Sequence, residues 1–395
     1  MKTRVATALT RGDAKSAAEV LGAAVRAQLA GQTPSLTMVF ASTQQPLEQM
    51  MPVLRRQLGG GTLLGTSTSG EFTEKGDAKS AAAIFAVAGD FEVFAGMGTG
   101  LKGDVEGAVR AAGAGLPRQR DGHPHCTTVL LLDPLAGKGE EATALAGAML
   151  GNEARLAGGA AGDDLRMKQT YIGIDERVAS DAIVLASIFS KEPLGVGVCH
   201  GHHPISSALT ITRSEGNVVY EIDGRPAWQV WAEHTRASAA ARGIDPAKLA
   251  PAEVGPYLLR YEAGLATGSS FRIRAPLARG DDGSLSFACG IPQGAVIRIT
   301  ESEQTAQVTS AREAARRARV QAGGAVVAGA VVFDCICRNL ILGDRFASAV
   351  HSIAEELGSV PIAGFETYGE IALDAGEMSG FHNTTTVVLT FPIGG

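Results

Sequence analysis

The sequence predicts an α/β protein with mixed sheets covered by helices, built from repeated strand–helix–strand–hairpin units. One phrase, G-x-x-T-x-G-E, occurs twice, at Gly65–Glu71 and Gly364–Glu370, and a shorter relative lies at Gly158–Asp164. Each copy follows a short apolar strand, which follows a helical stretch, which follows another apolar strand. Buried strands that alternate with amphipathic helices are typical of sheets shielded by helices. Three such units place polar turns at the ends of strands.

The first unit shows the pattern most clearly. Apolar residues at helical spacing predict a helix at 14–29, and Pro46, acceptable in a first helical turn, begins a second helix that ends at the glycines after residue 58. Strands are expected at 36–41 and 62–64. Two further apolar runs flank Gly89-Asp90, which predicts a hairpin. The unit therefore adds an antiparallel pair to its strand–helix–strand core.

The second and third units repeat this order. The second has helices at 104–112 and 139–150 and strands at 127–132, 155–157, 182–189 and 194–199. The last two of these strands are expected to pair as a hairpin across residues 191–193. The third has helices at 306–321 and 345–357 and strands at 325–333, 361–363 and 384–391. A middle segment with its own strands and one helix separates them. A chain of 395 residues exceeds one ordinary core, so we predict two domains, 1–204 and 205–395.

Composition excludes several classes of protein. The formal charge is −6 and the arginines of the last unit are interrupted by Glu313, so no nucleic-acid partner is expected. Five cysteines without framework spacing argue against a secreted disulfide scaffold. The N-terminus lacks a signal-peptide core, and no apolar run is long enough for a membrane span. We therefore expect a cytoplasmic protein.

The repeated phrase has a mechanical interpretation. Its glycines permit positive φ and a sharp reversal, and its threonine hydroxyl can cap the turn. The carboxylate is then aimed from a fixed backbone. Glu71, Asp163 and Asp164 are candidates for a secondary N-terminal site, with packing as the alternative role of these turns.

The C-terminal copy adds more chemistry. The segment Phe333–Arg338 ends an apolar strand, where ligands of α/β sheets gather. Arg338 offers a planar fork for a carboxylate, and Tyr368 and Glu370 could hold an ammonium or hydroxyl group. We predict a ligand site that also includes the following residues of the two motifs: Cys335, Thr367 and Gly369. The alternative is that Arg338 and Glu370 pair only to hold the sheet ends together.

Two groups of sulfur and nitrogen donors are candidate metal ligands. Cys335 and Cys337 would place both sulfurs on one face if the segment is extended, but they supply only half of a tetrahedral metal site. Cys199, His200, His202 and His203 form the densest group of nitrogen and sulfur donors, of the kind that bind zinc, copper or haem iron. A nucleophilic Cys335 with His351 or His382 as base is a further alternative, which no spacing supports.

Taken in order, these motifs resemble the FIST family, with an N-terminal region at about 30–220 and a C-terminal region at about 225–375. The resemblance is carried by six segments: Gly65–Glu71, Gly158–Asp164, Cys199–Pro204, Val218–Ala227, Phe333–Arg338 and Gly364–Glu370. It implies an intracellular sensory module for small ligands such as amino acids. It also implies that some relatives bind haem and sense nitric oxide, with His200 at the matching position for an axial ligand.

The sequence thus favours a non-enzymatic signal-transduction protein that binds an amino acid or small carboxylate. A haem-binding nitric-oxide sensor is the first alternative and a thiol-dependent enzyme the second. The sequence establishes no cofactor, and haem is the one candidate, under the first alternative. The resemblance implies output through a separate partner, such as a histidine kinase or a cyclic-nucleotide enzyme.

Overall fold

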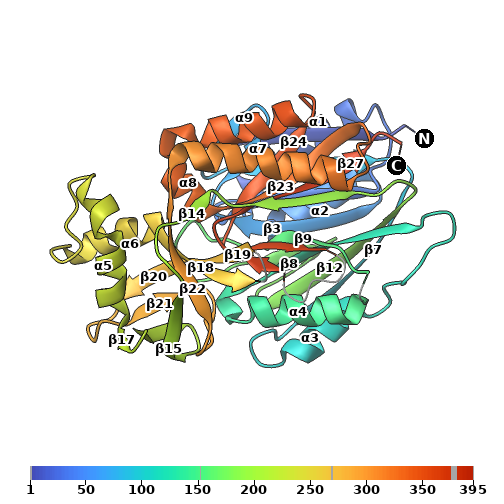
Figure 1. The fold of residues 1–395 in the computed structure, drawn as a ribbon. Helices are drawn as coiled ribbons and strands as arrows, with labels where there is room; N and C mark the ends of the chain where they lie inside the picture. Colours follow the sequence, from blue (N-terminus) through green and yellow to red (C-terminus); the bar gives the residue numbers. More distant parts are fainter. Residues whose placement is uncertain (1, 152, 268–269, 375–379, 395) are drawn as a thin grey trace.

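The structure, a computed structural model, describes residues 2–151, 153–267, 270–374 and 380–394. Within these ranges the strands form three six-stranded sheets and one nine-stranded sheet, with helices packed against them (Figure 1). The predicted mixed α/β fold is confirmed. Each of the three six-stranded sheets contains both parallel and antiparallel pairs.

The first two repeats follow one another directly. The first consists of β1 (Arg4–Thr10), α1 (Ala14–Gln28), β2 (Leu36–Ser42), α2 (Leu47–Leu58), β3 (Thr62–Thr68), β4 (Glu71–Thr73), β5 (Gly76–Ala78) and β6 (Ala82–Ala88). The second consists of β7 (Phe91–Thr99), α3 (Val105–Gly113), β8 (His125–Leu132), the short 3-10 helix Pro134–Ala136, α4 (Gly139–Leu150), β9 (Leu156–Ala160), β10 (Ile172–Ile174), β11 (Arg177–Ala179) and β12 (Ala182–Ser190).

The third repeat is interrupted after its first strand. It consists of β13 (Gly195–Cys199), α7 (Gln304–Gln321), β23 (Val327–Cys335), α8 (Ile336–Leu342), the 3-10 turn Gly343–Arg345, α9 (Phe346–Glu356), β24 (Ile362–Thr367), β25 (Glu370–Leu373), β26 (Phe381–His382) and β27 (Thr386–Pro392). The insertion contains β14 (His202–Pro204), β15 (Leu209–Glu215), β16 (Val218–Ile222), β17 (Arg225–Pro226), α5 (Ala227–Ala240), α6 (Pro251–Arg260), β18 (Tyr261–Thr267), β19 (Ser270–Arg274), β20 (Pro276–Arg279), β21 (Leu285–Phe287) and β22 (Val296–Ser302).

Each repeat completes the sheet of another repeat. Its two central strands pair in parallel, as β2 with β3, β8 with β9 and β23 with β24. The short strand that follows then leaves its own sheet: β4 pairs with β24, β25 pairs with β9, and β10 pairs with β3. The exchange therefore closes in a ring of three, and none of the three sheets is complete without a strand from another repeat.

Two expected hairpins are wrong. The strands on either side of Gly89-Asp90, β6 and β7, belong to different sheets, as do β12 and β13 around residues 191–193. These connections are the points where the chain passes from one repeat to the next. The apolar runs and the turn dipeptide are real, but the antiparallel partner of β7 is β12, the last strand of the second repeat. The prediction that these strands pair because they are adjacent in the sequence is therefore wrong.

The three six-stranded sheets share one central core. Buried side chains from all three, among them Phe85, Val129 and Phe333, form a single cluster. Helices cover the outer faces: α1 and α2 on the first sheet, α3 and α4 on the second, α7 and α9 on the third. Figure 1 shows α7 and α9 above the sheets and α3 and α4 below them. Alternate residues of each strand thus point into the shared core or against the helices.

Glycines allow two helices to lie directly on edge strands. A Cβ on Gly96 or Gly98 of β7 would overlap the carbonyl oxygens of Ala112 and Ala108 in α3. A Cβ on Gly195 or Gly197 of β13 would in the same way overlap carbonyl oxygens of α7. The obstructing atoms are backbone, which cannot rotate aside. Both second and third repeats therefore need glycine at alternate positions of their first strand.

The insertion is a subdomain with its own hydrophobic core. β14 pairs with β22, so the chain enters and leaves it side by side. Trp231, Tyr261 and Phe287 lie in its core. Residues 236–252, expected from their Ala- and Pro-rich composition as a surface excursion, run from the end of α5 to the start of α6. Helix α6 was missed because Pro251 and Pro256 obscure its pattern. Strands from both sides of residue 204 share sheets with one another.

The close approach of α3 to β7 predicts a strong effect of one methyl group. Gly98→Ala should lower the free energy of unfolding by about 2–4 kcal/mol, because the helix backbone must move away from the strand. Gly255→Ala, in α6 with no atom within 4 Å of its added Cβ, is the matched control and should be neutral or stabilising. Urea unfolding of both variants checks this, and equal stabilities would contradict the packing argument.

Candidate ligand-binding site

The three repeated turns meet one another through backbone hydrogen bonds. Gly162 N–H donates to the Ser67 carbonyl (2.9 Å), and Ser69 N–H donates to the Glu366 carbonyl (3.2 Å). Ala160 N–H donates to the Gly369 carbonyl (2.7 Å). The ends of β3, β9 and β24 therefore form one junction, to which each repeat contributes its motif.

The motif glutamates anchor these turns. Glu370 is fully buried and accepts hydrogen bonds from the Thr367 hydroxyl, from Thr385 N–H (3.0 Å) and from the Thr385 hydroxyl (2.9 Å). Glu71 has the same arrangement in the first repeat, with the Thr68 hydroxyl and Ala81 N–H (3.3 Å) as donors. In both repeats the carboxylate holds the amide that leads into the next long strand.

In the second repeat a different carboxylate holds the amide that leads into the next long strand. Its motif has Ala161 where the others have threonine, and Asp133, at the end of β8, accepts from Asp181 N–H (2.6 Å) just before β12. Because Asp133 has the anchoring role, Asp164 does not need to hold its own turn. It accepts hydrogen bonds from the Ser42 hydroxyl (3.1 Å) and Thr43 N–H (3.1 Å) of the first repeat. Glu71 and Asp164 are thus both engaged within the scaffold.

Asp163 fixes a loop beside this junction. Its carboxylate accepts from the backbone amides of Met167 (2.8 Å), Lys168 (2.6 Å) and Gln169 (3.0 Å), and from the hydroxyl of Tyr368 (2.6 Å). Burial opposes ionisation, but these hydrogen bonds hold the pKa of Asp163 below its ordinary value. Asp163 therefore connects the second repeat to the motif of the third.

The two glycines of the C-terminal motif are needed for packing rather than for positive φ. A Cβ on Gly364 would overlap the Val332 carbonyl oxygen and meet the ring of Phe72 at 2.5 Å, and one on Gly369 would collide with the ring of Phe381. Neither residue has a positive φ. The expected reversal through left-handed backbone is therefore wrong at these two positions.

Arg338 lies behind the strand ends, fully buried between α8 and α7. It donates through Nε to Asp334 (2.5 Å), through Nη1 to the side chains of Gln307 and Ser310 (2.9 Å to Ser310), and through Nη2 to the Gln307 carbonyl (3.0 Å). Every guanidinium nitrogen is thus engaged within the protein. The partner of Arg338 is Asp334, not Glu370.

An apolar cavity of about 530 Å³ opens next to this region. Its walls come from three parts of the chain, which are the second repeat, the third repeat and the insertion. They include Leu135 after β8, Ile336 and Leu340 of α8, and Leu259 and Pro276 of the insertion. Of the described residues that line the cavity, none has a charged side chain. A volume of this size and an apolar lining are typical of small-molecule sites.

Exposed hydrophobic side chains gather around the cavity. Leu165, Met167, Leu277 and Leu340 are each half exposed or more, and all four line it. Leu165 and Met167 have positive φ (62° and 52°), an unfavourable conformation for such residues. The hydrogen bonds to Asp163 hold this loop in place. Backbone strain that exposes apolar side chains indicates a functional surface.

The polar groups of the cavity are few. Cys335, Cys337, Tyr368 and Asn383 line it. Cys335 ends β23, whereas Cys337 lies in the first turn of α8, so the expected extended spacing is wrong, although both residues still face one cavity. Of the predicted ligand residues, Cys335 and Tyr368 line the cavity, while Arg338, Thr367, Gly369 and Glu370 lie behind it.

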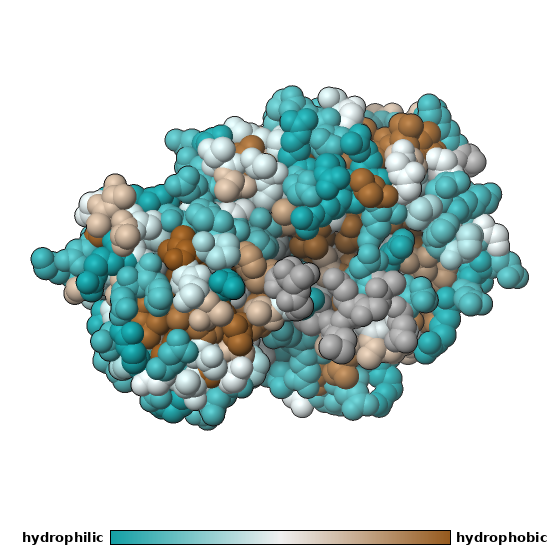
Figure 2. Space-filling model, in the orientation of Figure 1, coloured by the Kyte–Doolittle hydropathy of each residue, from teal (hydrophilic) through white to brown (hydrophobic). Residues whose placement is uncertain are grey.

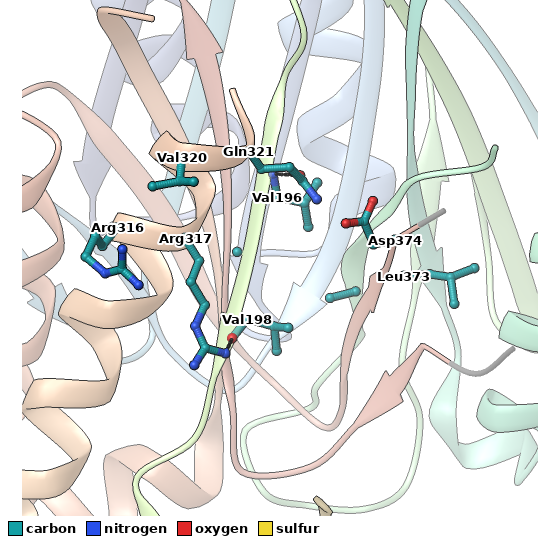
Figure 3. A pocket seen from close by; sticks show the side chains of 10 residues that line it. Val196, Val198, Arg316, Arg317, Val320, Gln321, Leu373 and Asp374 are labelled. Carbon is teal, nitrogen blue, oxygen red and sulfur yellow. Dashed lines mark hydrogen bonds between the residues drawn. The ribbon is translucent and has the colours of Figure 1, made fainter. Parts of the chain in front are cut away.

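Two other hollows are less suited to a ligand. One, of about 400 Å³, follows the edge strand β13 below α7, where Figure 2 shows apolar surface in a recess bordered by hydrophilic surface. Figure 3 shows Arg317 and Gln321 of α7 extending to β13, beside Val198 and Val196. Arg317 donates to the Val198 carbonyl (2.9 Å), and Gln321 accepts from Val196 N–H (2.5 Å), so these groups already occupy the sheet edge. The other, of about 100 Å³, lies at Ser42–Glu48.

The residues around His200 do not fit a haem iron. The ring packs on Phe271, with centroids 4.8 Å apart, and its Nδ1 accepts from His202 N–H (3.3 Å). Burial lowers the pKa of His200 to about 4, against a hydrogen bond to the backbone of Phe271. Nδ1 and one face of the ring are thus engaged within the protein. In the described part of the chain, no group of three or more His, Cys, Asp and Glu side chains could hold a metal ion.

The histidines considered as bases for Cys335 have other partners. His351 is on the exposed face of α9 and pairs with Glu355 (3.1 Å), and His382 Nε2 lies 3.0 Å from the Ala372 carbonyl oxygen. The group beside the Cys335 thiol is the carboxylate of Glu370.

The apolar lining residues from α6 and the loop at 165–167 had no sequence signal, because their exposure depends on the insertion and on positive φ.

These observations define an α/β protein of three interlocked repeats with a cavity of small-molecule size at its strand ends. Comparison with protein families identifies it further: the FIST N domain matches residues 35–225 and the FIST C domain matches residues 227–373. The chain belongs to the FIST family, as its motifs predicted. FIST domains are associated with signal transduction and the sensing of small ligands.

One curated relative is an uncharacterized protein of Methanocaldococcus jannaschii, 32% identical over 78 residues. The match covers 20% of this chain and 15% of that protein. In the part of the chain that the structure describes, no helix is both long and apolar enough to cross a membrane.

The burial of Glu370 predicts a pH dependence of stability. Burial raises its pKa from 4.5 to about 7 despite three donors, so ionisation is harder in the folded protein. The folded state loses stability as pH rises from about 4.5 to about 7. Glu370→Gln stays neutral, so relative to wild type its free energy of unfolding should rise by up to about 3 kcal/mol across this range. Urea unfolding at several pH values checks this, and parallel curves would contradict it.

Proposed function

We propose that this protein is a sensory protein that binds a small, largely apolar molecule in the apolar cavity. The observation that carries the proposal is the cavity itself, about 530 Å³ in volume and ringed by Leu165, Met167, Leu277 and Leu340. Burial of such side chains against an apolar ligand stabilises a complex by about 25 cal/mol per Å². Tyr368, Asn383 and the two thiols supply a few polar contacts, which would orient the ligand.

The chemistry of the lining favours an apolar ligand over an amino acid or small carboxylate. A carboxylate bound through Arg338 would have to displace Asp334, Gln307 or Ser310 from a fully buried guanidinium. Leaving such buried groups unpaired costs about 1–3 kcal/mol each. A neutral ligand needs no such rearrangement. Amino acids remain in the screen below as the alternative that Arg338 and Glu370 suggested.

Ligand binding in this cavity would act on the position of the insertion. The walls come from α6 and β20 of the insertion and from α8 of the third repeat, so an occupant contacts both bodies at once. A ligand with greater affinity for one arrangement of these bodies shifts the population toward it. The output would pass to a separate signalling protein, such as a histidine kinase or a cyclic-nucleotide enzyme.

A charge placed in the cavity tests the proposal. Thermal-shift screening with neutral aromatic and aliphatic compounds, amino acids, small carboxylates and haem should identify neutral ligands. Leu340→Glu should weaken their binding by about tenfold or more, because a carboxylate at the wall must be desolvated. Val20→Glu is the matched control, a helical residue of similar exposure (53% against 50% for Leu340) on α1.

Three other results would contradict the proposal. Unchanged affinity in Leu340→Glu would place the ligand elsewhere. Stabilisation only by amino acids, with affinity lost in Arg338→Lys, would restore the carboxylate site. A Soret band after incubation with haem would favour the haem-based alternative.

A further inference from the structure

Two thiols face the apolar cavity side by side. Cys335 and Cys337 both line it, one at the end of β23 and the other in the first turn of α8. The thiol of Cys335 lies beside the thiol of Cys337 and close to the carboxylate of Glu370, since both groups affect its ionisation or are affected by it. Cys335 is 3% exposed and Cys337 more so. The outer thiol is therefore reachable from the cavity, and the inner one lies between it and a carboxylate.

The scaffold does not require this pair. Cys335 pairs in register with Thr367, and the corresponding position in the first repeat is Ser42, which pairs with Thr68. Glu71 anchors its turn there without any thiol nearby, through Thr68 and Ala81. The two cysteines are thus confined to the repeat whose strand ends open into the large cavity.

We propose that Cys335 and Cys337 form a redox-active dithiol that small neutral disulfides entering the apolar cavity convert to an intramolecular disulfide. Thiols that are two residues apart and face one cavity can be joined by a local movement of the backbone. Two neighbouring thiols also distinguish this site from a single reactive cysteine, which could form only a mixed disulfide. The proposal depends on the cavity and its thiols, not on the sensory function.

The reaction balances without any further reactant. Cys337 loses its proton to solvent, and its sulfur attacks the disulfide RS–SR, forming a Cys337–SR bond and releasing RS⁻, which is protonated to RSH. Cys335 then gives its proton to Glu370 and attacks the sulfur of Cys337. The Cys335–Cys337 bond forms, the Cys337–SR bond breaks, and the second RS⁻ leaves and takes up a proton. One disulfide is reduced for each dithiol oxidised.

Glu370 is suited to accept the proton of Cys335. Burial raises the pKa of Glu370 to about 7, so a substantial fraction of the carboxyl is ionised near neutral pH and takes up a proton readily. The same burial raises the pKa of the Cys335 thiol, which makes it a poor first attacker. This separates the two roles: Cys337 attacks the incoming disulfide and Cys335 completes the exchange.

The test uses the full chain with Cys126 and Cys199, the other partly exposed thiols, changed to serine. Hydroxyethyl disulfide, which is small and neutral, should remove two alkylatable thiols per chain and leave no adduct detectable by intact mass. Cys335→Ala should stop at a single hydroxyethylthio adduct on Cys337, and Cys337→Ala should not react. Cystamine, of the same length but doubly charged, should react about tenfold more slowly because the lining offers no counter-charge.

A pair of matched variants tests the role of Glu370. Glu370→Gln should slow the second step, so the mixed disulfide on Cys337 accumulates transiently. Glu71→Gln removes the equivalent carboxylate of the first repeat and should leave both steps unchanged. Recovery of the mixed-disulfide lifetime in Glu370→Asp would support a proton-accepting rather than a merely structural role.

Several results would overturn the proposal. A stable mixed disulfide in the parent protein, a Cys289 disulfide, or equal rates with the two reagents would each do so. Because alanine variants could fail to fold, melting curves accompany them, and proteolysis of the oxidised parent maps the disulfide directly. A peptide spanning both cysteines with intact thiols after treatment would also contradict it.

Discussion

The constraint on which the rest of this structure depends is the ring of exchanged short strands. β4, β10 and β25 each leave their own repeat and complete another sheet. A repeat folded alone would leave two sheet edges unpaired and one face of its apolar strands uncovered, which is costly in water. The three repeats therefore fold as one unit around a shared core. The buried carboxylates stabilise this exchange because each fixes the amide that follows a crossing strand.

The cavity is a consequence of the same arrangement. The strand ends of all three repeats meet at one junction. A ligand bound at this junction can therefore be covered only by a part of the chain outside the three repeats. The insertion after β13 supplies that cover, and its helix α6 faces α8 across the cavity. Asp163 is central to this region, because it holds the strained loop of Leu165 and Met167 and also accepts the Tyr368 hydroxyl.

Much of the fold could be predicted from the sequence, because helices and long strands carry local periodicity. The repeats were visible in the spacing of Gly65–Glu71 and Gly364–Glu370. The pairing of strands was not, since β6 and β7 are adjacent in sequence but lie in different sheets. Charged residues near strand ends suggested a polar site, yet Arg338 and Glu370 are engaged by buried neighbours. Only Cys335 and Tyr368 of that set reach the cavity, whose apolar walls depend on tertiary contacts.

Comparison of equivalent positions in the three repeats distinguishes residues that the fold requires from residues that it does not require. The position at the end of the first central strand is Ser42 in one repeat, Asp133 in the second and Cys335 in the third. Asp133 replaces the motif glutamate as the anchor, and the second repeat accordingly lacks the threonine, having Ala161. A position that tolerates a hydroxyl, a carboxylate and a thiol is not fixed by packing. The thiol is found where the strand end faces a cavity with an uncharged lining and a second thiol follows, so its identity is better explained by the cavity than by the fold.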